Sequence, residues 1–331
     1  MGNRTTGWAL AIAAGMTWAL AVGCSDPPGP DTTGGTAGSG GAGGNGADAG
    51  PTAEEACEHD ARSLCQKYTE CMPWYVPAYF GDFETCVGRY VKTRCLTRVG
   101  LEDSSDTPAA REACAAARGA ATCAQWYDND LSQMPCLLLE GGKRVTGSAC
   151  GTAQQCQTTK CDIPEGAQCG TCGGPLVGAG APCVTSNDCD SNLQCFDGAC
   201  GLRRGLGEPC STASACQYEF TCINHSCQVP ARLRQSCLTK PCDAHAGLFC
   251  QSGAQVCESF GYVNVGERCD PFEGPFCRGG FCKLNAGNLP GVCVAMAREG
   301  EPCNDEVGPY CESWASCTKG VCKIPDYTTC K

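Results

Sequence analysis

Histidine and aromatic side chains are scarce in this chain of 331 residues. Only His59, His225 and His245 are present, so zinc sites built from cysteine and histidine cannot be numerous. Aromatic residues make up 7% of the sequence, whereas glycine contributes 44 residues. Much of the chain is therefore too rich in loops to bury the apolar surface that offsets the entropy of ordering. A large conventional hydrophobic core is excluded.

Clustered positive charge is also lacking, because the formal net charge is −11. A nucleic-acid partner would require a concentrated basic surface to meet the phosphate backbone. The densest basic spots are Arg203-Arg204 and the pair Arg232 and Arg234. We expect these to be solvated loop charges, and we expect no nucleic-acid partner.

Motifs of the common hydrolases and nucleotide-binding proteins are missing. The sequence has no G-x-S-x-G elbow, no H-E-x-x-H and no phosphate-binding glycine loop on a strand-to-helix turn. His59 stands beside Asp60 with no nucleophile identifiable near it, so we expect a solvated histidine or one close to a helix cap. The sequence predicts a protein that is not an enzyme and uses no cofactor.

Cysteine is the residue that the chain has in excess, with 35 copies. This frequency is typical of disulfide scaffolds. Bridges at such density persist only in oxidising compartments, and a reduced cytosolic protein would need metal sites to occupy the thiols. The count predicts an exported, disulfide-rich protein.

The first 23 residues have the composition of a signal peptide. Arg4 precedes an apolar stretch from Trp8 to Val22, which is short for a membrane span. The sequence Leu20-Ala21-Val22-Gly23-Cys24 resembles the bacterial lipobox, although Ala21 stands where leucine is commonest. That resemblance implies lipid, including palmitate, on Cys24, which would become the new amino terminus. The alternative is an ordinary cleavage site with Cys24 in a disulfide.

Residues 24–53 read as a flexible tether after the lipid. They are rich in glycine, serine, alanine and threonine and contain no aromatic residue. A coil of this length reaches about 30 Å, so we expect it to hold the folded part away from the bilayer.

Residues 54–140 show helical periodicity and predict a disulfide-stapled helical bundle. The first helix begins at a capping box formed by Thr52 and Glu55. A second helix is expected from Asp82 to near Gly100, and a third from Thr107-Pro108 to about Cys123. Cysteines nine residues apart on one helix lie too far from each other to bond, so bridges should run between helices or to loops. The candidate cysteines are Cys57, Cys65, Cys71, Cys86, Cys95, Cys114, Cys123 and Cys136, and their connectivity stays open.

The aromatic residues between the first two helices allow two interpretations. Trp74, Tyr75, Tyr79 and Phe80 lie in a segment punctuated by proline. They either form a binding surface or cover the small core.

Residues 147–331 contain a cysteine repeat, roughly G-x-x-C followed by three more cysteines. The clearest copies follow Gly180 and Gly207 with the spacing C-x5-C-x5-C-x4-C. Their cysteines are disulfide candidates: Cys183, Cys189, Cys195, Cys200, Cys210, Cys216, Cys222 and Cys227. Looser copies begin at Cys237, Cys269 and Cys303. The irregular first copy, from Cys150, has a fifth cysteine, and Cys330 would make the number of cysteines available for pairing even. Modules with two bridges each predict local stability and an elongated, stiff rod.

This repeat resembles the cysteine-rich modules of the Dickkopf amino-terminal type, and more loosely EGF-like and EB modules. The layout of a bundle followed by repeats resembles Cys-rich lipoproteins of Gram-negative bacteria. Such a resemblance implies an extracellular interaction module at the outer membrane or cell surface.

Two short motifs could carry chemistry. Cys169 and Cys172 form a C-x2-C pair, which could be a redox site or half of a zinc site, but structural bridges are the favoured interpretation. Asp188, Asp190 and Asn192 could ligate calcium, but turn residues are favoured.

The function that these features favour is that of a non-catalytic, lipid-anchored envelope or cell-surface protein that displays disulfide-stapled binding modules. Its expected partners are a membrane, through the lipid, and an extracytoplasmic protein or glycan. The first alternative is a protease inhibitor that uses one exposed loop, and the second is a thiol-disulfide redox protein.

Overall fold

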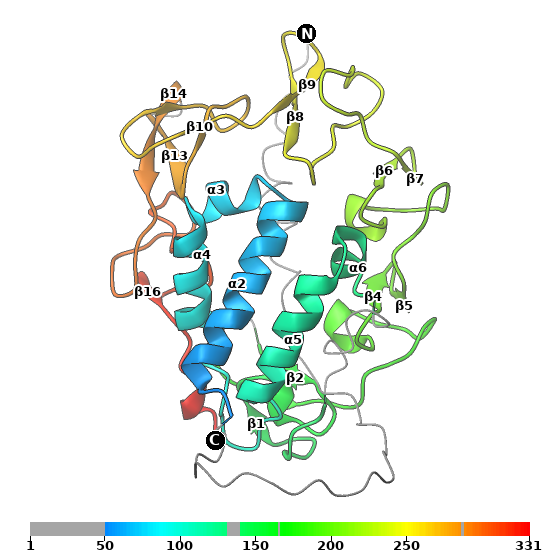
Figure 1. The fold of residues 1–331 in the computed structure, drawn as a ribbon, viewed down its shortest axis with the longest axis vertical. Coiled ribbons are helices and arrows are strands. Elements are labelled where there is room, and N and C mark those ends of the chain that lie inside the picture. The colour runs from blue at the N-terminus through cyan, green and yellow to red at the C-terminus, as the bar shows by residue number, and fades with distance from the viewer. Residues whose placement is uncertain (1–49, 131–139, 165, 286–287) are drawn as a thin grey trace, which may run out of the picture.

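The computed structural model describes residues 50–130, 140–164, 166–285 and 288–331. The predicted signal peptide, Cys24, most of the tether and Cys136 lie outside these ranges. The described residues confirm the predicted fold class: a disulfide-stapled helical bundle is followed by tandem Cys-rich modules with little regular structure (Figure 1).

Within residues 50–130 the bundle has three longer α-helices and two short ones. Their bounds are α2 (Ala53–Cys71), α3 (Tyr75–Tyr79), α4 (Phe83–Tyr90), α5 (Pro108–Ala120) and α6 (Cys123–Tyr127).

The predicted helix starts are confirmed, because each depends on a local capping side chain. Thr52 Oγ1 accepts a hydrogen bond from the Glu55 N–H at 3.2 Å, and the Glu55 carboxylate accepts one from the Thr52 N–H. The Asp82 and Thr107 side chains cap α4 and α5 by accepting one hydrogen bond each, from the N–H groups of Thr85 and Ala110.

The predicted helix ends differ from the structure. The α-helix from Asp82 ends at Tyr90 and continues as the π-helical turn η1 (Val91–Cys95). The third helix ends at Ala120, because Thr122 caps the new helix α6.

Disulfides tie α2 to its neighbours, as the helical spacing required. The pairs are Cys57–Cys95, Cys65–Cys86 and Cys71–Cys123. Cys114 is also disulfide-bonded. These bridges surround a small core to which α2 contributes Leu64 and Tyr68, and α4 contributes Val87 and Tyr90.

A buried ion network crosses the bundle, and nothing in the sequence patterns indicated it. Asp60 on α2 is fully buried, and its carboxylate accepts hydrogen bonds from Arg111 at 2.9 Å, Arg118 at 2.6 Å and the Tyr90 hydroxyl at 2.9 Å. Arg111 also pairs with Asp106. The network joins three elements through one carboxylate.

Six modules follow the bundle, and all use the same bridge pattern when the extra cysteine of the first module, Cys169, is left out of the count. The first cysteine then pairs with the third, and the second with the fourth. They begin at Gly147, Gly180, Gly207, Arg234, Gly266 and Gly300, and we number them one to six. The pairs are Cys150–Cys161 with Cys156–Cys172, Cys183–Cys195 with Cys189–Cys200, Cys210–Cys222 with Cys216–Cys227, Cys237–Cys250 with Cys242–Cys257, Cys269–Cys282 with Cys277–Cys293, and Cys303–Cys317 with Cys311–Cys322.

Short strands run through every module, and they pair antiparallel except for residues 262–263 and 276–277, which pair in parallel. In every module the third and fourth cysteines lie directly opposite each other on paired strands, as Cys195 does with Cys200. The strands are β1 (Ala149–Cys150), β2 (Cys161–Asp162), β3 (Gly170–Cys172), β4 (Gln194–Phe196), β5 (Ala199–Gly201), β6 (Thr221–Ile223), β7 (Ser226–Gln228), β8 (Leu248–Gln251), β9 (Val256–Ser259), β10 (Tyr262–Val263), β11 (Arg268–Cys269), β12 (Phe276–Cys277), β13 (Gly280–Asn285), β14 (Asn288–Ala295), β15 (Ser316–Thr318) and β16 (Val321–Lys323).

The leading glycine of the repeat has a backbone role. In five modules its φ is positive, and its N–H donates to the carbonyl of the fourth cysteine at 2.8 Å. A Cβ on Gly207 would meet nothing within 4 Å. Glycine is therefore favoured here because it adopts a positive φ easily, and not because a side chain would clash. In the fourth module Arg234 occupies this position with φ +62°, and its N–H donates to the carbonyl of Cys257.

Arg234→Gly is therefore expected to stabilise the fourth module by about 0.5–1 kcal/mol, since an L side chain is strained in this region whereas glycine is not. Gly207→Ala is the matched control and should destabilise the third module by a similar amount. Chemical denaturation of both variants tests the pair, and a loss of stability in Arg234→Gly would contradict the argument.

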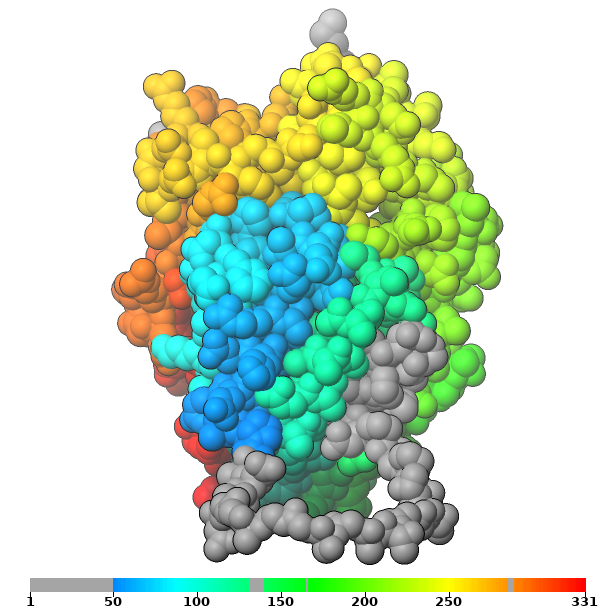
Figure 2. Space-filling view, in the orientation of Figure 1, coloured from blue at the N-terminus to red at the C-terminus, as the bar shows by residue number. Residues whose placement is uncertain are grey.

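The modules curve around the bundle, so the predicted elongated rod is wrong. In Figure 1 they pass along one side of the helices, over one end and back along the other side. Cys330 bonds to Cys169 of the first module across 161 residues of sequence, which closes the modules into a ring. Figure 2 shows one face of the helices left open between the flanking modules.

The aromatic residues between α2 and α4 explain this curvature. Trp74 contacts Phe260 of the modules, with ring centroids 6.0 Å apart, and Phe80 contacts Trp314 at 4.8 Å. The Tyr262 hydroxyl donates to the Trp74 carbonyl at 3.0 Å. Tyr75, Tyr79 and Phe80 therefore pack on the bundle core. Trp74 and Phe80 also hold the modules, which have little apolar core of their own.

Candidate ligand-binding groove

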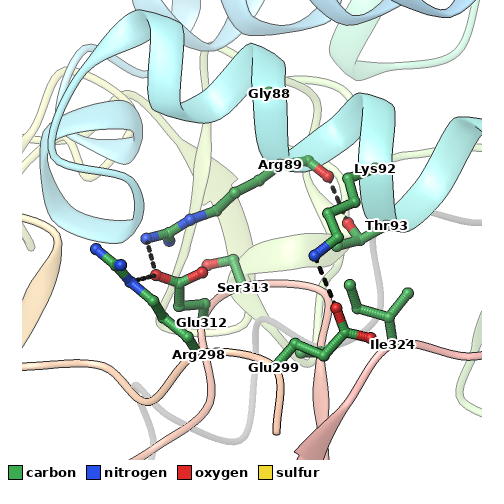
Figure 3. A pocket seen from close by; sticks show the side chains of 10 residues that line it. Gly88, Arg89, Lys92, Thr93, Arg298, Glu299, Glu312, Ser313 and Ile324 are labelled. Atoms are coloured by element: carbon green, nitrogen blue, oxygen red, sulfur yellow. Dashed lines mark hydrogen bonds and ion pairs between the residues drawn. The ribbon is translucent and has the colours of Figure 1, made fainter. Parts of the chain in front are cut away.

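A groove lies between the bundle and the sixth module, with a volume of about 370 Å³. One wall comes from α4 and η1, and the other from the strands and loops of residues 298–324 (Figure 3). The lining residues are Gly88, Arg89, Lys92, Thr93, Arg298, Glu299, Glu312, Ser313, Ala315 and Ile324.

Helical periodicity arranges the first wall. Residues spaced three and four apart share a face, so Arg89, Lys92 and Thr93 lie along the same side of α4 and η1. Gly88 leaves open space beside them. The Thr93 hydroxyl donates to the Arg89 carbonyl at 2.7 Å, which ties the two helical segments together at the groove.

Ion pairs connect the two walls. Arg89 donates to Glu312 at 2.7 Å, and Lys92 donates to Glu299 at 2.7 Å. The Arg298 Nε atom lies 3.7 Å from the same Glu312 oxygen (Figure 3). Burial lowers the pKa of Arg89, and Glu312 partly offsets that shift. The groove holds three cationic side chains against two carboxylates, an excess of positive charge in a protein of net charge −11.

The groove was not found from the sequence, because its walls lie about two hundred residues apart and contain no motif. The only local signal is the spacing of Arg89 and Lys92 on the polar side of the second helix, and such charges usually face solvent.

A second polar cluster lies where α6 meets the modules. The Arg203 guanidinium sits 4.4 Å from the Tyr127 ring centre, and His245 stacks on Tyr218 at 4.8 Å. The Asp128 carboxylate accepts a hydrogen bond from the Tyr218 N–H at 3.0 Å. The expectation that Arg203 is a solvated loop charge is wrong, because only 9% of its side chain is exposed.

Burial shifts the pKa values of two groups in this cluster. Burial raises the pKa of Asp128 to about 6, although Arg203 acts in the opposite direction. Burial also lowers the pKa of His245.

Asp128→Asn is expected to become more stable relative to the native chain as the pH rises from 4 to 7. The native carboxyl has a raised pKa, so its contribution to stability is present below the ordinary value and is lost as the pH rises through about 6. Asparagine does not titrate and still accepts from the Tyr218 N–H. Denaturation curves across this pH range test the prediction, and a stability difference that does not change with pH would contradict it.

The C-x2-C pair is not a redox pair in this structure. Cys169 bonds to Cys330, and Cys172 bonds to Cys156. Structural bridges, the favoured interpretation, are therefore present. Sulfur atoms of three cysteines lie within 4.8 Å of one another in each of several modules, but these sulfurs belong to disulfides and offer no thiolate to a metal.

The acidic residues near the second module are turn residues, as favoured. The Asp188 carboxylate accepts from the Val184 and Thr185 N–H groups and from Lys160 at 2.6 Å. The hydrogen bond from Lys160 is the main cause of the lowered pKa of Asp188. Asp190 accepts from the N–H of the next residue.

His59 is an exposed residue of α2 that contacts Glu112 at 2.7 Å. Every named candidate cysteine within the described ranges is disulfide-bonded. Cys24, the predicted lipidation site, and Cys136 lie outside those ranges.

Among the described residues, no helix combines the length and the apolar character needed to cross a membrane. Comparisons with known proteins identify no relatives: no protein-family model, no curated protein and no solved structure matches this chain.

Proposed function

We propose that this protein is a non-catalytic binding scaffold of the cell envelope or surface, anchored by lipid on Cys24. Disulfide bonding on the observed scale is typical of exported proteins. The closed ring of modules provides a rigid frame, and a rigid frame lowers the entropy that its loops lose on binding.

One observation carries the proposal. In four modules the loop between the first and second cysteine exposes a large apolar side chain, although single exposed apolar residues elsewhere need no explanation. These residues are Val184 (91% exposed), Leu238 (68%), Phe272 (54%) and Val307 (69%). Their recurrence in one loop of the repeat favours a shared role in contacting an extracytoplasmic protein or glycan.

Serine substitutions at these four positions test the role of the loops. A soluble version starting at residue 50 keeps the Thr52 cap and can be used to capture envelope proteins and glycans. The quadruple variant should lose capture. Leu202→Ser with Leu206→Ser, which changes exposed apolar residues outside these loops, should keep it. Failure of the native chain to capture any such ligand above background, or capture that survives in the quadruple variant, would count against the proposal.

The lipid anchor has its own test in the intact mass of the natively produced protein, extracted in detergent. A mass that starts at Cys24 and includes acyl chains, with no free thiol before reduction, supports the proposal. If the mass shows a chain without lipid, the lipid anchor is no longer part of the proposal.

Protease inhibition is the second candidate. The loop between Cys269 and Cys277 presents Phe272, and the Asp270 carboxylate accepts the Phe272 N–H at 2.8 Å and the Glu273 N–H at 3.1 Å. Such a pre-organised loop suits a protease with an apolar specificity pocket. Lack of inhibition across a broad protease panel would remove this candidate.

A further inference from the structure

The groove between α4 and the sixth module contains cationic groups that the protein does not fully pair. Arg89 and Arg298 share the carboxylate of Glu312. The Arg298 Nε atom is 3.7 Å from that carboxylate, which is too far for a hydrogen bond. No hydrogen bond from its guanidinium to another described residue is present, and 79% of its side chain is exposed. Several N–H donors of Arg298 are therefore available to a ligand.

Arg89 is held in place before any ligand arrives. It donates to the Tyr79 carbonyl at 3.1 Å and to Glu312 at 2.7 Å, and its guanidinium carbon lies 5.9 Å from the Phe80 ring centre. A charge fixed by its own structure loses little entropy on binding. The groove thus combines one fixed guanidinium with one exposed guanidinium.

The remaining lining selects among anions. The groove carries one excess positive charge, which matches a monoanion, whereas a phosphate dianion would meet the carboxylates of Glu299 and Glu312. Ala315 and Ile324 supply an apolar surface beside the charges. The volume of about 370 Å³ lies at the small end of the range for ligand pockets, ~300–1,000 Å³.

We propose that this groove binds the carboxylate of a small organic acid or of a peptide carboxyl terminus, with an apolar portion against Ile324. Arg298 donates two parallel hydrogen bonds to the carboxylate, the arrangement that guanidinium and carboxylate groups favour. Arg89 contributes a fixed positive charge at the base of the site. The inference deepens the proposed binding role and rests on it, but it uses a surface distinct from the four apolar loops.

Calorimetric titration of the full-length, oxidised protein with defined probes tests the site. The probes are hexanoate, N-acetyl-Ala-Ala with a free carboxyl terminus, the amides of both compounds, and inorganic phosphate. Hexanoate or the peptide acid should bind with a dissociation constant below about 1 mM, and both amides should bind at least about tenfold more weakly, since charge-assisted hydrogen bonds are lost. The acid that binds more tightly identifies the source of the carboxylate.

Arg298→Gln should weaken binding of the acid at least about tenfold. The matched control is Arg232→Gln, because Arg232 occupies the same place in the fourth module: its N–H donates to Gln235 as that of Arg298 does to Glu301. This control should leave binding unchanged. Free-thiol counts show whether each variant keeps its disulfides, and Lys92→Gln, which changes an exposed side chain on the opposite wall, should weaken binding as a second variant.

Three outcomes overturn the site. They are no binding of either acid by the native chain, binding that Arg298→Gln leaves unchanged, and phosphate binding tighter than that of both acids. If the acids fail to bind while the apolar loops still capture an envelope ligand, the site is removed and the proposed binding role stands.

Discussion

Asp60→Ala is expected to lower the free energy of unfolding by about 3–5 kcal/mol, because it removes the central acceptor of a buried network. Arg111, Arg118 and the Tyr90 hydroxyl all donate to this fully buried carboxylate. Without it, two guanidinium groups stay buried with fewer partners, and buried unpaired charge is costly. Chemical denaturation followed by circular dichroism of the helices measures the loss.

Glu58→Ala is the control on the same helix. Glu58 is exposed and pairs with Arg62 at 3.1 Å, and an exposed pair contributes about 0–1 kcal/mol. If Asp60→Ala costs no more than Glu58→Ala, the network does not have the structural role that its burial indicates.

Because of the Asp60 carboxylate, the stability of the protein is expected to depend on pH in the acidic range. Burial alone would raise the pKa of Asp60, but Arg118 and Arg111 outweigh that effect and lower it. A lowered pKa means that the contribution to stability is present above the ordinary carboxyl value, about 3.9, and is lost as the pH falls below it. The native chain should therefore lose more stability than Asp60→Ala between pH 4 and pH 2. Parallel loss in both proteins would contradict this assignment.

Opening the ring of modules is expected to cause the second large loss of stability. Cys169→Ser with Cys330→Ser removes the bridge between the first module and the last residues of the chain. Loss of a native disulfide typically costs about 2–5 kcal/mol, mainly because the unfolded chain gains freedom. Hydrogen exchange should become faster in the first and sixth modules, while the amides of α2 and α5 keep their protection.

Lys331→Ser is the control for this double variant, since it changes the adjacent exposed residue and leaves the bridge intact. It should leave both stability and exchange unchanged. If the double variant matches this control in both measurements, the closure does not contribute to stability.

Local features of the fold were predictable from the sequence. The caps at Thr52, Asp82 and Thr107 depend on one side chain and the next three residues. The tandem repeat and the disulfide-rich fold class also follow from the number and spacing of the cysteines. By contrast, the end of the third helix depends on Thr122, a cap that the alanine-rich pattern obscured.

The bridge pattern could have been narrowed further. Between the third and fourth cysteines of the second module, Asp197 and Gly198 both have positive φ, and Asp-Gly is a strong signal for a two-residue hairpin turn. A hairpin places Cys195 opposite Cys200, but which distant cysteine each one bonds to depends on how the loop before it folds back.

Long-range features were not predictable by the same means. The rod followed from treating each module as stable by itself, yet Phe260 and Trp314 pack on the bundle. Isolated aromatic residues in a repeat carry no periodic signal. The groove depends on the same packing, because only the curved path brings Arg298 beside Arg89.

Disulfide mapping of the natively produced protein tests the closed ring of modules most directly. Non-reducing digestion followed by mass spectrometry should yield a peptide that links Cys169 to Cys330. With Cys169 left out of the count, it should also yield first-to-third and second-to-fourth pairs in all six modules. A bridge from Cys169 to Cys172, or a free Cys330, would contradict the closed ring.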